Sequence, residues 1–368
     1  MTATLLTQGT FFFPGPTEVR AEVLAAMTRP LIAHRGAAFE SLYANIQTAL
    51  KPIFGTTRPV YVSSSSATGL MESAVRCAPE GRVLALVNGA FSARFAAIAK
   101  ACGRESDVIE VPYGEVVTLD MVEDALKTQR YAAVTVAHSE TSTGALQDVR
   151  GITALARAHG AVCLVDSVTG IGGAELAFDE WELDFALTGS QKALAMPPGL
   201  AFAAATPAFI DAARATTRRG LYFDLVEFDA YGAKNQTPNT PAISLFFAAE
   251  AQLPAIVAEG MRARWARHRT MAEQTYAWVS ELAERHGDAF GILAQQGHRT
   301  PTVTSVTVPA SFTASTLVRA VAQRGFTIGN GYGKNRETTF RIGHMGDHVP
   351  ERLAECLAVV GEAIGELV

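Results

Sequence analysis

The sequence predicts an α/β fold with a large domain on a mostly parallel central sheet flanked by helices, followed by a smaller α+β domain. Between residues 60 and 205, short apolar runs alternate with alanine-rich amphipathic segments, which is typical of β-α units around a buried parallel sheet. From about residue 247, long helical stretches precede a few strand-like runs and a closing helix. We therefore expect a large domain at 15–246, and a small domain formed by 1–14 and 247–368.

The expected elements of the large domain follow one another in regular order. Strands are predicted where aliphatic and β-branched residues cluster, at 60–65, 82–88, 106–112, 131–138, 161–166, 184–189 and 200–205. Helices are predicted between them at 68–77, 90–102, 118–128 and 148–160, with Thr118 as the N-cap of the third. In the small domain we expect helical structure over 247–287, strands at 302–309, 326–333 and 339–345, and a helix at 350–367.

Composition excludes several classes of protein. The 368 residues are 48% hydrophobic and 18% charged with a net charge of −5, so the chain is globular and has no basic excess for nucleic acid. The cysteines lie far apart without metal-ligand spacing, and we expect reduced core thiols in a cytoplasmic protein and no metal site; they are Cys77, Cys102, Cys163 and Cys356. No signal peptide or membrane segment is predicted.

Small polar residues follow the first of these strands. Ser65, Ser66, Ala67 and Thr68 open a predicted helix, where backbone N–H groups and the helix dipole favour an anion such as phosphate. An ordinary helix N-cap explains the same residues.

Two charged residues end later strands of the predicted sheet. Asp166 follows a central apolar strand, where a carboxylate is costly unless it meets a cation or a donor such as a protonated pyridine nitrogen; an N-cap or a metal ligand is the alternative. Lys192, in "FALTGSQKALAMPPG", has no charged neighbours within several residues. An amine in an apolar site loses its charge easily and suits a Schiff base, although a lysine that extends to the surface from a strand end is also common.

Two further features are consistent with a binding site. The polar loop "HSETSTG" follows the strand at 131–138 and includes Thr141, which either bonds a ligand or caps the next turn. Arg341 lies in the strand-like run "TFRIGHMG" and either binds a substrate carboxylate or forms a structural salt bridge. Together, the anion loop, the aspartate, the lysine and the arginine are the components of one pyridoxal phosphate (PLP) site.

With these residues assembled, the chain resembles the class V aminotransferases, which are fold type I PLP-dependent enzymes. It is most similar to the alanine–glyoxylate and serine–pyruvate branch, including its aspartate-using relatives. The motifs that carry the resemblance are "PGPTEV", "HSETSTG", "VDSVTGIGG", "TGSQKALAMPPG" and "RIGHMGD". They span nearly the whole chain.

The resemblance implies a role for each site residue. Lys192 would be the Schiff-base lysine and proton carrier, Asp166 the partner of the pyridine nitrogen, and Arg341 the ligand of the substrate carboxylate, with Gly15 closing over it. The remaining cofactor residues would be Val168 and Phe91 on the two ring faces, Thr141 near the ring hydroxyl, and Ser66, Ala67, Thr68 and Gln191 at the phosphate. Thr240, or less favourably Thr237, would complete the phosphate site of the neighbouring subunit of a homodimer.

The predicted activity is the transfer of an amino group from alanine, serine or aspartate to glyoxylate or pyruvate, in two half-reactions. Phosphonate or phosphoserine transamination, or a lyase reaction on the same scaffold, remains open. A cysteine desulfurase is disfavoured because Gln191 stands where a histidine usually precedes the lysine, and because no cysteine falls between Cys163 and Cys356. A binding protein without turnover is disfavoured because the lysine, aspartate and arginine are all present.

Overall fold

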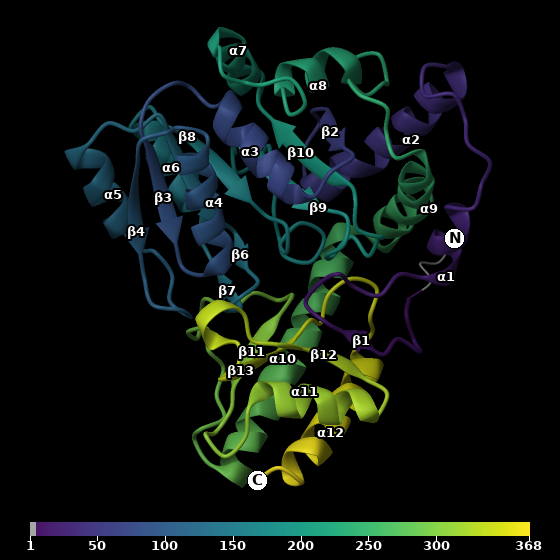
Figure 1. The fold of residues 1–368 in the computed structure, drawn as a ribbon, viewed down its shortest axis with the longest axis vertical. Coiled ribbons are helices and arrows are strands. Elements are labelled where there is room, and N and C mark those ends of the chain that lie inside the picture. The colour runs from purple at the N-terminus through teal and green to yellow at the C-terminus, as the bar shows by residue number, and fades with distance from the viewer. Residues whose placement is uncertain (1–4) are drawn as a thin grey trace.

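The computed structural model describes residues 5–368 and contains two main sheets, one in the upper and one in the lower half of Figure 1. The larger sheet has seven strands in the order β2-β10-β9-β8-β5-β3-β4, and only β10 runs antiparallel to its neighbours. The strands are β2 (Val60–Ser63), β3 (Val83–Val87), β4 (Ser106–Glu110), β5 (Ala133–Ala137), β8 (Val162–Asp166), β9 (Phe185–Gly189) and β10 (Ala201–Ala205). The predicted α/β class with a mostly parallel sheet is confirmed.

Helices cover both faces of this sheet because side chains alternate between the faces along each strand. In β5, Val134 and Val136 enter one apolar layer, whereas Ala133 enters the other. The first layer is completed by α2 (Ala37–Phe54), α5 (Leu119–Thr128), α6 (Val149–Ala158) and α9 (Ile243–Glu259), with the short α1 (Ala21–Ala26) beside α9. The second is completed by α3 (Ala67–Cys77), α4 (Ala90–Ala101), α7 (Pro207–Ala215) and α8 (Leu225–Gly232).

The smaller sheet has the order β1-β12-β13-β11 and a separate apolar core. Its strands are β1 (Phe11–Phe12), β11 (Thr304–Thr307), β12 (Thr327–Asn330) and β13 (Thr339–Ile342), and its helices are α10 (Met261–His286), α11 (Ala314–Gln323), α12 (Pro350–Gly365) and the 3-10 turn η1 (Gly333–Asn335). Because β1 pairs with β12, the N-terminal segment joins this sheet before it enters the larger unit. A two-stranded ribbon, β6 (Ser139–Glu140) and β7 (Ala145–Leu146), completes the strands.

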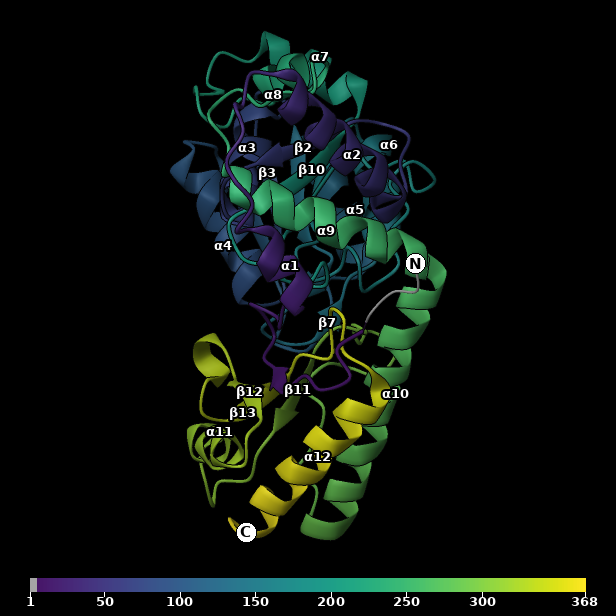
Figure 2. The same cartoon turned by 90° about the vertical axis from the view of Figure 1, so that its right-hand side faces the viewer.

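The chain passes from the larger sheet to the smaller one at Gly260. This glycine has a φ of 82° and separates α9 from α10, whose axes differ by 85°. Figure 2 shows α9 crossing the larger unit and α10 descending beside α12. Phe247 and Leu253 of α9 belong to the core of the larger sheet. We therefore propose that the chain divides at Gly260 rather than at residue 247.

Within residues 5–368, no single helix is both long and apolar enough to cross a bilayer. Helices α9 and α10 meet that condition only when they are joined across the 85° bend.

Local signals explain which elements the sequence revealed. Thr118 caps α5 as predicted, because its hydroxyl accepts a hydrogen bond from the Met121 N–H at 3.3 Å. Helices α1, α2, α7, α8 and α11 were not predicted from the sequence. Helix α2 has Gly36 as its N-cap, without a capping side chain, and contains Pro52 in its last turn, so the signal for its start is weak. All four cysteines are free, and only Cys102 is not fully buried.

Candidate active site

The carboxyl ends of several parallel strands meet at one edge of the larger sheet, where doubly wound folds bind ligands. A cavity of about 400 Å³ lies at this edge. The predicted cofactor and catalytic residues that line it are Ser66, Ala67, Thr68, Phe91, Thr141, Asp166, Val168, Gln191 and Lys192, and Gly15 lines it from the N-terminal segment. The fold thus brings together residues from six segments that are far apart in the sequence.

Lys192 follows β9 and is held against the N-terminal segment. Its Nζ donates a hydrogen bond to the carbonyl of Pro14, and its own carbonyl accepts one from the Thr17 hydroxyl at 3.0 Å. Gly15 has a φ of 98°, and a Cβ at this position would overlap the Lys192 side chain, so only glycine permits this approach. Burial, together with the positive charge of Arg341, lowers the pKa of the Lys192 amine to about 7.

Asp166 is the last residue of β8 and is 4% exposed. Its Oδ1 accepts a hydrogen bond from the Val168 N–H at 2.9 Å. Burial raises the pKa of the Asp166 carboxyl to about 7, against the lowering effect of that hydrogen bond. The carboxyl therefore lies near its titration midpoint at neutral pH, and a cationic partner would hold it ionised.

The start of α3, which also lines the cavity, fits an anion. Ser66 precedes α3 in an extended conformation and makes no side-chain capping bond, so the first N–H groups of this 11-residue helix are not capped by it. Gln191 lines the same cavity, and its Oε1 is buried without a partner within residues 5–368. The cavity thus combines a helix start that suits a phosphate with a carboxyl that suits a ring nitrogen, so the residues present fit PLP.

Arg341 reaches the same region from β13 of the smaller sheet. Its Nε donates to the Asn330 carbonyl at 2.8 Å and its Nη1 to the Thr141 carbonyl at 3.1 Å, which ties the two sheets together. The guanidinium lies 5.5 Å from the ring centroid of Tyr332, and burial lowers the pKa of Arg341 to about 10. At neutral pH it remains a cation and can bind a carboxylate.

Three neighbours of the site were not among the predicted site residues: Tyr332, Arg94 and Glu140. Tyr332 stacks on Phe91 with 5.0 Å between ring centroids, and its hydroxyl accepts a hydrogen bond from Arg94 at 3.2 Å. Glu140 is fully buried and accepts hydrogen bonds from the N–H groups of Phe91 and Ser92, so it fixes the start of α4. The sequence signal for Glu140 was its place in the polar loop after β5, opposite a helix start that has no cap of its own.

The predicted ligand Thr240, and two further residues with polar side chains, His344 and Arg35, do not line the Lys192 cavity. Thr240 is exposed and lines, with Thr237 and Ser64, a small separate cavity. His344 is buried against Thr304 and the Pro301 carbonyl, and it does not line either cavity that contains Lys192. Arg35 donates to the carbonyls of Thr237 and Pro238, outside the Lys192 cavity.

Comparison with known proteins decides the family. The model of the class V aminotransferases matches residues 12–334. This chain belongs to the class V aminotransferases. It is 31% identical to an L-aspartate–glyoxylate aminotransferase of Paracoccus denitrificans, over 99% of this chain and 92% of that protein, and 31% identical to a serine–glyoxylate aminotransferase of Arabidopsis thaliana, over 95% and 88%. The crystal structure of an alanine–glyoxylate aminotransferase from Nostoc superposes with a TM-score of 0.90 at 28% identity, covering 99% of this chain and 98% of that one.

Membership of this family means that the protein has fold type I and is an aminotransferase, with an amino acid and a 2-oxo acid as substrates. It is about 30% identical to members of the glyoxylate aminotransferase group. Class V aminotransferases typically use PLP.

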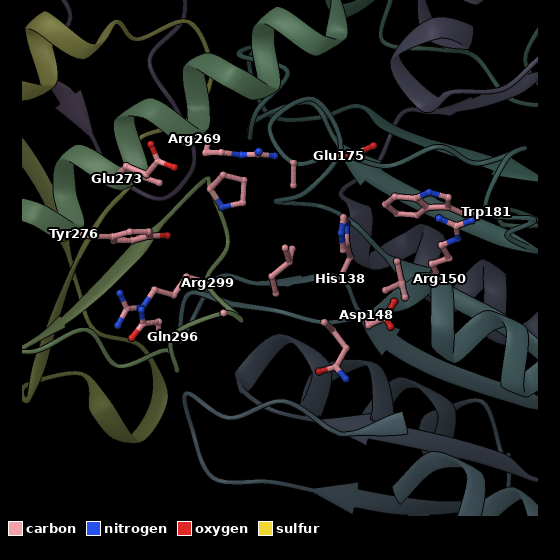
Figure 3. Close-up of a pocket in the computed structure, with 17 residues that line it drawn as sticks. His138, Asp148, Arg150, Glu175, Trp181, Arg269, Glu273, Tyr276, Gln296 and Arg299 are labelled. Carbon is pink, nitrogen blue, oxygen red and sulfur yellow. The ribbon is translucent and has the colours of Figure 1, made fainter. Parts of the chain in front are cut away.

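The aminotransferase also has a cavity of about 560 Å³ next to α10, shown in Figure 3. Its acidic side chains, Asp148, Glu175 and Glu273, are matched in number by Arg150, Arg269 and Arg299. His138 lines it, and Nδ1 of this histidine lies 2.9 Å from the hydroxyl of Ser167. Ser167 is the residue that follows Asp166 in the chain. No group of three or more potential metal ligands occurs here or elsewhere in residues 5–368.

Proposed function

We propose that this protein is a PLP-dependent aminotransferase that moves an amino group from alanine, serine or aspartate to glyoxylate or pyruvate by two half-reactions. One observation carries the proposal. A buried lysine and a buried aspartate, each with a pKa of about 7, line one cavity together with the start of α3, whose N-cap residue makes no side-chain capping bond.

The residues that line this cavity provide the proposed cofactor contacts. Asp166 would hold the protonated ring nitrogen, while the remaining ligands would be Val168 and Phe91 at the ring faces, Thr141 at the ring hydroxyl, and Ser66, Ala67, Thr68 and Gln191 at the phosphate. When bound, PLP supplies an aldehyde that reacts with amines and a ring that takes up electrons.

Lys192 is suited to carry a proton to and from the substrate α-carbon. An amine with a pKa of about 7 is partly neutral at neutral pH, so it can take up a proton and later return it. Its hydrogen bond to the Pro14 carbonyl and its contact with Gly15 restrict where Nζ can lie. Arg341, held by two backbone carbonyls, would bind the substrate carboxylate and so orient the α-carbon toward Lys192.

A homodimer is part of the proposal. Thr240 is exposed and lies outside the Lys192 cavity of its own chain, so its predicted phosphate contact requires a second copy. Tyr222, at 47% exposure, lines the same small cavity as Thr240, and its neighbour Leu221 is 85% exposed, so apolar surface is available for such a contact.

The test is an absorption spectrum of the purified protein with PLP, before and after alanine, serine, aspartate or aminoethylphosphonate is added separately without an acceptor. We expect one small amino acid to remove the visible band of the lysine-bound cofactor and to produce the pyridoxamine band, and glyoxylate or pyruvate to reverse the change. A protein with no such band after PLP is supplied would contradict the proposal. Reaction with aminoethylphosphonate alone would support phosphonate transamination instead.

A further inference from the structure

The charged residues that line the opening in front of Lys192 are all positively charged. This cavity of about 720 Å³ lies between the N-terminal segment and the smaller sheet, and its charged lining residues are Lys192, Arg336 and Arg341. No aspartate or glutamate lines it within the described chain. The cavity of Figure 3, in contrast, has three acidic and three arginine side chains. Charge complementarity therefore favours a substrate with more than one negative group.

Two of the three cations are already assigned by the proposed function. Lys192 bonds the cofactor, and Arg341 is positioned for the α-carboxylate. Arg341 uses Nε and Nη1 for backbone carbonyls, whereas Nη2 has no protein hydrogen-bond partner among residues 5–368 and is available to a ligand. A donor with one carboxylate would thus leave Arg336 without an anionic partner in the substrate.

Arg336 follows η1, and its backbone is well fixed although its side chain is 72% exposed. The loop is closed by a hydrogen bond from the Gly331 N–H to the Thr339 carbonyl at 2.6 Å and by one from the Thr339 hydroxyl to the Asn335 carbonyl at 3.0 Å. The nearest carboxylate of Arg336 is Glu337 at 3.6 Å, and Glu337 already accepts two hydrogen bonds from Ser315. The guanidinium is therefore only loosely paired.

We infer that Arg336 binds the distal carboxylate of the amino donor, so that the preferred donor is a dicarboxylic amino acid such as aspartate. The inference rests on the proposed function and narrows its donor class. A carboxylate is favoured over a phosphate because one exposed guanidinium supplies few of the hydrogen bonds that a phosphate dianion accepts.

The test compares Arg336→Ala with Lys334→Ala, a matched variant that removes a cation from the same turn but outside the cavity. Loss of the lysine-bound cofactor band is followed with aspartate, alanine and phosphoserine. We expect aspartate to be the best donor of the wild type, and Arg336→Ala to lower kcat/KM for aspartate about tenfold while alanine changes less than about twofold. Lys334→Ala should leave both donors unchanged, and added salt should reduce the aspartate preference.

A binding measurement separates this inference from the proposed function. Titration calorimetry should show that the wild type with PLP binds succinate more tightly than propionate, and that Arg336→Ala binds the two equally. Equal loss for aspartate and alanine, a preference for phosphoserine, or no preference for succinate overturns the role of Arg336. If no donor removes the cofactor band but succinate is still preferred, the proposed function fails and the dicarboxylate site stands.

Discussion

Two cavities of this protein differ in how their charges are held. The opening in front of Lys192 leads to buried ionisable groups, with Lys192 8% and Asp166 4% exposed. The charged side chains of the cavity of Figure 3 balance in sign and are mostly exposed, as Asp148, Arg269 and Glu273 are. Burial has moved the pKa values of Lys192 and Asp166 toward neutrality. The comparison indicates that the reactive site is marked by buried charges whose pKa values have shifted, and not by cavity volume alone.

The largest effect should come from Lys192→Ala. We expect amino transfer to fall by more than about a thousandfold, because the variant lacks both the group that bonds the cofactor and the group that carries the proton. Circular dichroism should show an unchanged fold. Arg269→Ala, in the cavity of Figure 3, is the matched control and should keep its activity within about twofold. Full turnover by Lys192→Ala would contradict the assignment.

A second prediction concerns the cofactor-free protein and pH. The pKa of Lys192 is about 7 when folded and lies near its ordinary value of about 10.4 when unfolded, so the unfolded chain binds more protons between these limits. The free energy of unfolding of the wild type should therefore rise relative to that of Lys192→Met from about pH 7 to pH 10, by on the order of 3 to 5 kcal/mol. Urea titrations across this range measure the difference. A constant difference would mean that the amine is not buried.

Asp166→Asn should lower kcat by about 100- to 1000-fold. Asparagine keeps an oxygen for the Val168 N–H but removes the charge that would hold the ring nitrogen protonated. Steady-state kinetics at saturating PLP, together with the dissociation constant of PLP, separates this effect from lost binding. Asp148→Asn makes the same change in the cavity of Figure 3 and should leave kcat unaltered. An equal loss of kcat in Asp166→Asn and Asp148→Asn would contradict the view that only the cavity of Lys192 takes part in the reaction.

The smallest effect should come from Asp148→Ala. Asp148 caps α6, since its side chain accepts a hydrogen bond from the Gly151 N–H at 2.9 Å. We expect the free energy of unfolding to fall by about 1 kcal/mol without a change in kcat/KM. Chemical denaturation and steady-state kinetics provide the two readings. A clear loss of activity would show that the cavity of Figure 3 acts on the reaction.

The sequence by itself determined the alternation of strands and helices and the polar residues at the strand ends. Both are local: β5 and β8 are mainly apolar runs, Asp166 ends β8, and Lys192 comes three residues after the end of β9. Since the carboxyl ends of parallel strands meet at one edge, these residues were expected to share a site. The family resemblance added the roles of residues such as Phe91 and Val168, which composition and periodicity do not reveal.

The tertiary structure decided the rest, because it depends on contacts between distant segments. Arg341 donates a hydrogen bond to the Thr141 carbonyl 200 residues away, and Lys192 donates one to the Pro14 carbonyl 178 residues away. The core around the larger sheet includes α9, which the change of pattern near residue 247 had suggested for the small domain. The pKa of a side chain and the charge balance of a cavity follow from which groups folding removes from water together, and that is fixed only when the two sheets close on the N-terminal segment.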